Sequence, residues 1–251
     1  MTTRRPKLYA LPASAPCAAV EAALELKSIA YDRVDLVPTS QILIGPVRYG
    51  GTTVPGMRLN GERLVGSRLI IHRLEALVEE PPLLPLVGSP FYGEVLEAER
   101  WGDEVFQDAP RRIIVAAFLR DPQAMEAYAG DKLPLPIGLA RPAMPLTARL
   151  MALRYKATDE VARADLEALP ARLDLIDSWI AKRVLGEVRP NVADLQIGST
   201  IRLLLSIEDV RPLIAGRAAA ALADYFPPLA ANVREGALPA EWIAAVAGPE
   251  S

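Results

Sequence analysis

The sequence has few of the residues that build most metal and redox sites. Its 251 residues include one cysteine, Cys17, and one histidine, His72. One cysteine excludes an intrachain disulfide and any metal site with several thiolates, and one histidine excludes sites that need two imidazoles. We therefore expect no metal centre. Any chemistry has to use hydroxyls, carboxylates, backbone amides, arginines or the single thiol.

The chain also lacks excess charge and long apolar runs. Its 28 Lys and Arg against 31 Asp and Glu give a net charge of −3, which offers no electrostatic reason to expect nucleic acid or an anionic membrane as a partner. Every apolar stretch is shorter than the roughly 18 residues of a membrane span, and no signal-peptide core follows the N-terminal charges. These absences predict a soluble, cytoplasmic protein without a nucleic-acid or membrane partner.

The first 80 residues alternate between strand and helix patterns. Short apolar runs at residues 7–11 and 34–37 flank residues 16–27, where apolar residues recur at helical spacing. This order predicts a βαβ unit with parallel strands, because a helical crossover returns the chain in the same direction. Residues 41–47 fit a short helix that an internal Gly-Pro pair cuts.

A hairpin and a third helix are expected next. Asn60 and Gly61 separate two short apolar runs, and this pair favours a type I′ turn, which needs positive φ at both positions. Ser67 then stands where it would cap a helix with apolar residues up to residue 78. The predicted order is a βαβ unit, an irregular segment and a ββα unit.

Beyond residue 80 the pattern becomes helical. The predicted organisation is an α/β unit over residues 1–80, a proline-rich linker over residues 81–88 and an all-helical unit over residues 89–251. The length allows two domains, since it corresponds to roughly 1.7 domains of about 150 residues. Pro110 is expected to kink or divide the first helix, and residues 120–141 look like a loop. The expected helices cover residues 91–119, 142–155, 158–184 and 193–205, and a final alanine-rich helix pair covers residues 211–225.

Four motifs, in this order, resemble those of glutathione transferases. Residues 14–20 (Ser-Ala-Pro-Cys-Ala-Ala-Val) are similar to the theta-like corner Ser-x-Pro-Cys-x-Ala-Val. Residues 53–55 resemble the family's Val-Pro, residues 67–70 its Ser-x-Ala-Ile, and residues 191–194 its Ser-x-Ala-Asp capping box. The resemblance implies a thioredoxin-like βαβαββα domain followed by an all-helical bundle.

The resemblance assigns the chemistry to Ser14. It implies that the Ser14 hydroxyl donates a hydrogen bond to the sulfur of glutathione, or of a similar low-molecular-weight thiol, and favours its thiolate. The position suits an anion, because the unpaired N–H groups and the dipole of the following helix face it. The alternative is a serine that only caps this helix.

The resemblance also implies a binding site for the rest of the thiol. Val54 and a cis Pro55 would hold its peptide like an added strand, and Ser67 its γ-glutamyl carboxylate, with the backbone N–H groups after Gly66. A tight turn and a helix cap are the structural alternatives. Two residues depart from the family pattern, since Thr53 replaces a basic residue and Gly66 an acidic one. Two charge-assisted contacts are therefore missing.

An electrophile site is expected between the two units, facing Ser14. Trp101, Phe106 and Arg111 are the candidates from the first helix of the all-helical unit. Aromatic residues at helical spacing fit a core equally well. Arg111 would offer positive charge to a developing anion or be solvated.

Three further residues have structural and functional interpretations. Cys17, in a first helical turn, either has a lowered thiol pKa or is a small buried residue that packs the helix on the sheet. His72 is expected at the surface or the edge of the core, without a role. Asp194 is expected to cap its helix by accepting hydrogen bonds near Asn191.

These observations favour an enzyme that conjugates a thiol to an apolar electrophile. It would work as a homodimer, as members of this family usually do. One alternative is a non-catalytic ligand-binding protein of the same fold that has lost the thiol site, which Thr53 and Gly66 motivate. Another is monothiol redox chemistry through Cys17.

Overall fold

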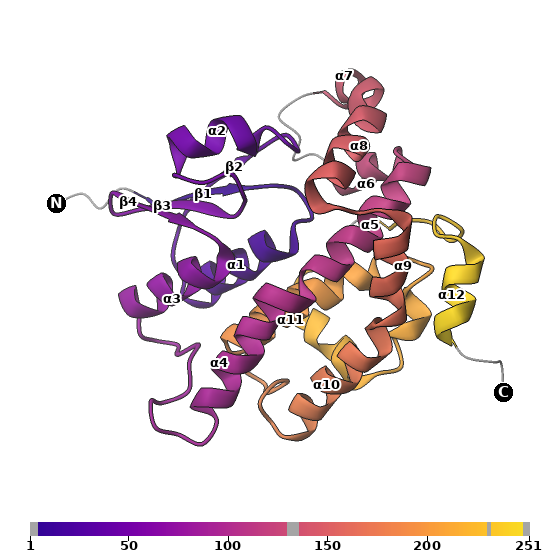
Figure 1. The fold of residues 1–251 in the computed structure, drawn as a ribbon. Coiled ribbons are helices and arrows are strands. Elements are labelled where there is room, and N and C mark those ends of the chain that lie inside the picture. Colours follow the sequence, from indigo (N-terminus) through magenta and orange to yellow (C-terminus); the bar gives the residue numbers. More distant parts are fainter. Residues whose placement is uncertain (1–4, 130–135, 230–231, 248–251) are drawn as a thin grey trace.

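A computed structural model describes residues 5–129, 136–229 and 232–247. The N-terminal part is built on a four-stranded sheet with strand order β2-β1-β3-β4 (Figure 1). β1 pairs in parallel with β2 and antiparallel with β3, which pairs antiparallel with β4. The strands and helices of this part are β1 (Lys7–Ala10), α1 (Ala15–Leu26), β2 (Asp32–Asp35), α2 (Gln41–Arg48), β3 (Gly56–Leu59), β4 (Glu62–Val65) and α3 (Ser67–Leu77).

Helices cover both faces of this sheet. α1 and α3 lie together on the face turned toward the rest of the chain, and α2 lies on the other face (Figure 1). Asn60 and Gly61 have φ of 50° and 90°, so the predicted hairpin turn is confirmed. The predicted parallel βαβ unit and the thioredoxin-like order of elements are confirmed as well.

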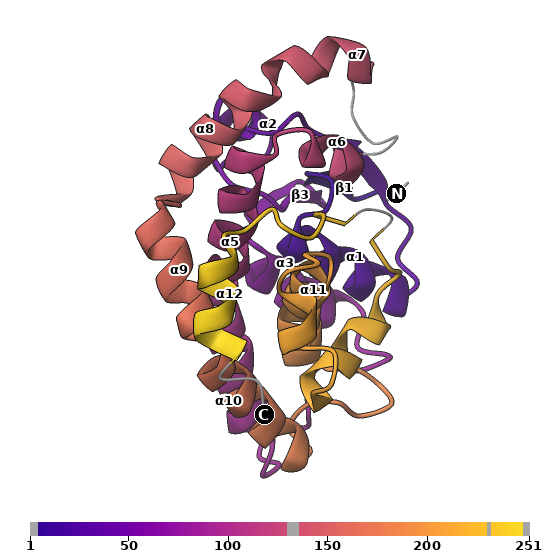
Figure 2. The same ribbon diagram turned by 90° about the vertical axis from the view of Figure 1, so that its right-hand side faces the viewer.

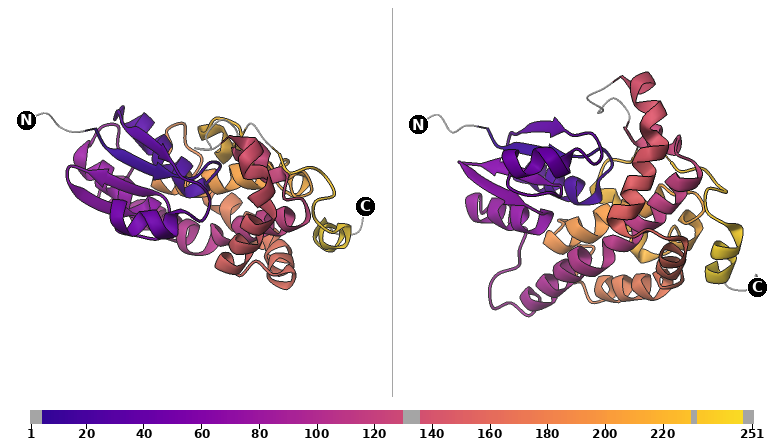
Figure 3. Two further views of the ribbon diagram at one scale, coloured as in Figure 1. Left: turned by 90° about the horizontal axis from the view of Figure 1, so that it is seen from above. Right: turned by 45° about the horizontal axis from the view of Figure 1, so that its top comes forward.

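The remainder of the described chain is helical and packs beside the sheet layer (Figure 3). Its α-helices are α4 (Tyr92–Trp101), α5 (Asp108–Arg120), α6 (Ala124–Ala129), α7 (Ile137–Ala140), α8 (Met144–Tyr155), α9 (Asp159–Glu167), α10 (Leu169–Ala181), α11 (Val192–Leu205) and α12 (Ala240–Ala247). The division of the chain at residues 80 and 88 stays a prediction. No helix among these described residues is long and apolar enough to cross a membrane.

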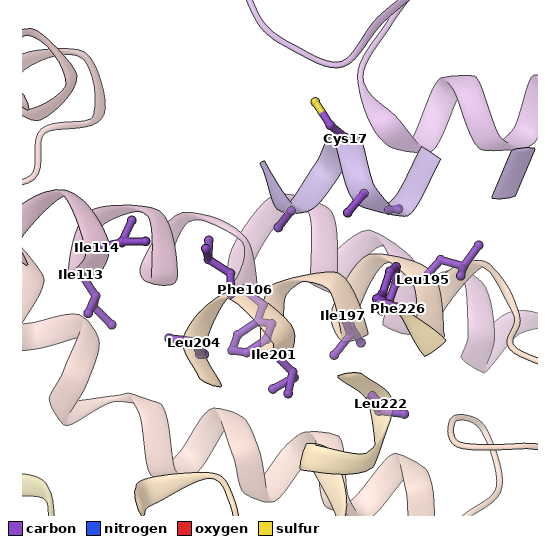
Figure 4. Packing of buried hydrophobic residues seen from close by; sticks show 14 of the residues in the cluster. Cys17, Phe106, Ile113, Ile114, Leu195, Ile197, Ile201, Leu204, Leu222 and Phe226 are labelled. Carbon is purple, nitrogen blue, oxygen red and sulfur yellow. The ribbon is translucent and has the colours of Figure 1, made fainter. Parts of the chain in front are cut away.

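Helix α11 lies at the centre of the helical part. Twelve of its 14 residues are buried, and it packs against α1, α4 and the segment Ala218–Tyr225 (Figure 4). Gly198 permits one of these contacts, because a Cβ there would lie 2.4 Å from the Leu222 carbonyl oxygen. The apolar core runs without a break from the sheet through α11 to the C-terminal helices. The two parts of the chain therefore share one core.

Several expected helix boundaries are wrong. The first helix of the helical part is divided by a π-helical segment, Gly102–Phe106, and not at Pro110. Pro110 lies in the first turn of α5, where a missing N–H costs nothing. The helix expected over residues 158–184 is two helices, α9 and α10, and α2 continues through its internal Pro46.

The expected helix pair over residues 211–225 is present, but its two helices are neither α-helices nor the last ones of the chain. The segments Arg211–Leu213 and Ala218–Tyr225 are 3₁₀ helices, and α12 follows them. Alanine favours an α-helix, but close packing against α11 overrides this local preference. The loop expected over residues 120–141 contains α6 and α7, and residues 130–135 lie outside the described residues.

Candidate functional site

A cleft of about 590 Å³ lies between the sheet layer and the C-terminal helices. Its N-terminal wall consists of residues 11–16, at the entry to α1, and residues 52–54, before β3. Its other wall comes from α5, α6 and the end of α8, and α8 lies beside α2 (Figure 2). The volume is in the range of small-molecule sites.

Ser14 lines this cleft at the N-cap position of α1, with its side chain half-buried. Its backbone is extended, with φ −69° and ψ 117°, and its side chain caps no backbone N–H group of the helix. Pro16, in the first turn, has no N–H to offer. The Ser14 hydroxyl is thus not used as a helix cap, and it stands with the positive end of the α1 dipole at the cleft wall.

Val54 lines the same wall. The Val54–Pro55 peptide bond is cis, as expected, and Pro55 is buried. Among the described residues, neither the N–H nor the C=O of Val54 has a backbone hydrogen-bond partner. Backbone groups without such a partner can pair with the backbone of a ligand. The structure therefore brings Ser14 and Val54 to one cleft and leaves Pro55 behind its surface.

The start of α3 is arranged differently from the prediction. Gly66, with φ 94°, is the N-cap residue, and Ser67 is the first helical residue, so the expected cap at Ser67 is wrong. A φ of 94° is open to glycine and strained for an L-residue with a side chain. Ser67 is only 1% exposed, and neither it nor Gly66 lines the cleft.

The Ser67 hydroxyl already has a hydrogen-bond partner from a distant part of the sequence. It accepts a hydrogen bond from Nε2 of Gln196 on α11, at 2.9 Å. The same nitrogen donates to Oδ1 of Asp103 in the π-helical segment, also at 2.9 Å, and Gln196 is fully buried. Burial raises the pKa of the Asp103 carboxyl, and the nearby Arg68 opposes this shift. Sequence reasoning missed Gln196 and Asp103, because only the packing of α11 brings them to α3.

The predicted aromatic site residues lie in the core. The rings of Trp101 and Phe106 stack with centroids 5.1 Å apart, and Trp101 meets Trp179 edge-on at 5.3 Å. Phe106 is fully buried, and neither Trp101 nor Phe106 lines the cleft. The interpretation of these two residues as core residues therefore replaces their assignment to the electrophile site.

Arg111, by contrast, lines the cleft. It donates to Oδ1 of Asp108 at 2.6 Å and to Oε1 of Gln107 at 2.7 Å. Its guanidinium lies 5.0 Å from the centre of the Tyr155 ring, and that of Arg154 lies 5.8 Å from the same ring. These contacts place Arg111 at the cleft wall on α5, facing the end of α8.

The C-terminal wall of the cleft is cationic beside an apolar patch. The charged lining residues are one carboxylate and four cations, namely Asp108, Arg111, Arg112, Arg154 and Lys156. Arg112 is itself bound to Asp165, at 2.5 and 3.0 Å. The apolar lining includes Ile114, Phe118, Met125, Met151 and Leu203. This combination suits a ligand with an apolar body, and the residues on α8 were not found from the sequence, where they carry no motif.

Cys17 is buried, at 1% exposure, and its sulfur points away from α11 (Figure 4). Burial raises the pKa of its thiol, more strongly than hydrogen bonds with Ser14 and the Leu11 backbone lower it. Of the two interpretations of Cys17, the packing interpretation fits, and the alternative of a lowered thiol pKa does not. A buried thiol with a raised pKa also gives no support to the redox alternative.

His72 and Asp194 have structural roles. Nε2 of His72 lies 2.7 and 2.9 Å from the two carboxylate oxygens of Glu99, which is fully buried. Asp194 accepts from the backbone N–H groups of Asn191, at 2.9 Å, and Gly186, at 2.8 Å, which confirms the predicted capping. Burial raises the pKa of Asp194 to about 6. Both residues lie outside the cleft.

Comparison with protein families and solved structures supplies independent evidence. Residues 8–82 match the family model described as the glutathione S-transferase N-terminal domain. No curated protein matches the sequence. The fold is similar to that of the beta-etherase LigF from Sphingobium sp. strain SYK-6, with 17% identity, 89% of each chain covered and a TM-score of 0.59.

Two plant enzymes have the same fold. A Tau class glutathione S-transferase from mango (Mangifera indica) is 14% identical, with 97% of each chain covered and a TM-score of 0.53. Poplar glutathione transferase F1 is 13% identical over 87% of this chain and 90% of its own, with a TM-score of 0.58. Structures with such low identity show that the fold is shared and nothing more. Their similarity confirms the predicted thioredoxin-like part followed by an all-helical part.

Proposed function

We propose that the chain is a glutathione S-transferase-like protein that joins a low-molecular-weight thiol to an apolar electrophile, a proposal that the match of residues 8–82 and the shared fold support. One observation carries the proposal. The Ser14 hydroxyl lies at the N-terminus of α1, lines the cleft and caps no helix N–H. The hydroxyl contacts the neutral thiol of Cys17, and a bound thiolate in the cleft would be a stronger acceptor for it.

The proposed reaction is a substitution at carbon. The thiol releases its proton to water, and the Ser14 hydroxyl and the positive end of α1 stabilise the thiolate that remains. The sulfur then uses its electron pair to form a bond to the electrophilic carbon, and the leaving group departs with the pair of the bond that breaks. Holding both reactants in one cleft supplies the orientation.

The rest of the cleft supports this assignment. The free backbone groups of Val54 would pair with the peptide part of the thiol. The apolar residues of α5 and α8 would receive the body of the electrophile, with Arg111 beside the charge that develops on it. We further propose a homodimer that acts in the cytoplasm, with a thiol-binding domain over residues 1–80 and a helical domain over residues 89–251.

The test compares Ser14→Ala with the wild type in transferase assays with several thiols and a general electrophile. Loss of a hydrogen bond to a charged sulfur should lower kcat/KM by roughly tenfold to a hundredfold and move the thiol ionisation in the pH–rate profile to higher pH. Ser178→Ala on α10, whose hydroxyl donates to the Leu175 carbonyl, is the matched control. Unchanged activity and an unchanged pH profile in Ser14→Ala would remove Ser14 from the mechanism.

A non-catalytic ligand-binding protein is the second candidate. The burial of Ser67 favours it, because this serine is the residue that the family resemblance assigns to the thiol's carboxylate. Calorimetry distinguishes the two candidates. Binding of apolar ligands without any heat from millimolar thiol would support the second candidate and contradict the first.

A further inference from the structure

We infer that the thiol site of this protein is short: it holds a cysteine-type thiol at Ser14 and Val54 and ends before α3, so that a γ-glutamyl group adds nothing to binding. This inference rests on the proposed thiol transfer and names the class of thiol. Glutathione differs from such a thiol by its γ-glutamyl arm, which needs a partner beyond the cysteine. In this structure the start of α3, where the resemblance places that partner, is buried and its hydroxyl is already hydrogen-bonded.

The first observation is the occupied hydroxyl of Ser67. The amide nitrogen of Gln196 donates to this hydroxyl at 2.9 Å, and it also donates to a carboxylate oxygen of Asp103 at 2.9 Å. Since Ser67 is 1% exposed, an incoming carboxylate reaches neither its hydroxyl nor its N–H. To open this place, the ligand would have to displace a fully buried amide and leave Asp103 without its donor, which is unfavourable.

The second observation is the charge around the start of α3. Arg68, the nearest cation in the sequence, lies 3.5 Å from Glu99 and 3.5 Å from Glu104. Glu104 also pairs with Arg100 at 3.5 Å, and Glu99 with His72 at 2.7 Å, so the charge of Arg68 is already shared between two carboxylates and is not available to a further one. Gly66 and Thr53 supply no compensating charge, since neither side chain is ionisable.

The third observation is the extent of the cleft. It includes Ser14 and Val54 on the N-terminal wall, but neither Gly66 nor Ser67. Its cations come from α5 and from the end of α8, so a carboxylate near the thiol is attracted toward the helical part and away from α3. The extent of the cleft and the position of its cations therefore both favour a ligand that extends from Ser14 toward α5.

Two matched probes test the inference by calorimetry. S-methylglutathione carries the γ-glutamyl arm, and N-acetyl-S-methylcysteinylglycine lacks it. Methylation removes differences in thiol ionisation, and acetylation removes the extra ammonium of the shorter peptide. We expect the two dissociation constants to agree within about threefold. A preference of tenfold or more for S-methylglutathione, or no binding of either probe, would overturn the inference.

Two substitutions at α3 sharpen the test. Ser67→Ala removes the hydroxyl, and Arg68→Gln removes a half-exposed charge at the surface. Both should leave the affinities of both probes within about twofold of the wild type. A loss of tenfold or more that is confined to S-methylglutathione, in either variant, would show that the γ-glutamyl arm binds at α3. Arg68→Gln decides the question if Ser67→Ala does not fold.

Turnover separates this inference from the proposed function. If both probes bind equally and no thiol is transferred to an electrophile, the proposed function fails and the short thiol site stands. If thiol is transferred and S-methylglutathione binds at least tenfold better, the proposed function stands and the inference fails.

Discussion

Replacement of His72 by alanine should destabilise the protein by about 3 kcal/mol, because it leaves a buried carboxylate without a hydrogen-bonding partner. The His72 ring lies on α3, and its Nε2 is 2.7 and 2.9 Å from the carboxylate oxygens of Glu99 on α4. Glu99 is fully buried, and the nearby guanidinium of Arg68 is 3.5 Å away. Without His72, the buried carboxylate would keep only this longer contact.

The magnitude follows from the burial of the two partners. Removing the hydrogen-bonding partner of a buried acceptor costs about 1–3 kcal/mol, and more when the acceptor is charged, because the acceptor stays unsatisfied. The Glu99 side chain is fully buried and the His72 side chain is 33% exposed, so water reaches only the His72 side of the contact and a cost of about 3 kcal/mol applies. A chain of this length loses roughly 2–4 °C in Tm per kcal/mol, which gives a shift of about 6–12 °C.

Urea unfolding at pH 7, followed by circular dichroism, measures this cost. His72→Gln is the matched control, because its amide keeps an N–H donor within reach of Glu99, and it should recover at least about half of the lost stability. The reasoning is refuted if His72→Ala loses less than about 1 kcal/mol, the size expected of an exposed ion pair.

Two further predictions concern buried groups. Iodoacetamide should label Cys17 on the order of a hundredfold more slowly in the folded protein than in urea, because the thiol is buried and its pKa is raised; equal rates would contradict this. The raised pKa of Asp194, about 6 against 3.8, means that the folded protein holds this proton more tightly than the unfolded chain. The stability it contributes is therefore present below pH 3.8 and lost as the pH rises through 6. Asp194→Asn should not lose this stability, so its free energy of unfolding relative to the wild type should rise by up to about 3 kcal/mol between pH 3.8 and 6. A difference in the free energy of unfolding that stays constant over this pH range, measured by urea titration, would contradict the prediction.

Much of the fold was predictable because its signals are local. The Asn60-Gly61 turn depends on the backbone freedom of two adjacent residues, and the Asn191–Asp194 capping box on residues three positions apart. Helix boundaries failed where distant packing prevailed. The alanine-rich segment Ala218–Tyr225 is a 3₁₀ helix against α11, although its composition favours an α-helix.

The candidate site divides in the same way. Ser14 and Val54 could be found from the sequence, because each lies within a short motif at the edge of a strand or helix, and the structure brings both to the cleft. Trp101 and Phe106 could not be assigned, since helical spacing does not distinguish a core face from a cleft wall. Arg154 and Lys156 reach the cleft only because α8 packs beside α5.

The sequence by itself determined the scarcity of thiols and imidazoles, the order of strands and helices, and the serine at the entry to α1. These properties depend on composition and on neighbouring residues. Only the tertiary structure decided that Cys17 is buried with a raised pKa, that His72 pairs with Glu99, and that Gln196 occupies Ser67. Each of the last two contacts joins residues far apart in the chain, and a side chain's exposure, charge environment and free hydrogen bonds are set by such neighbours.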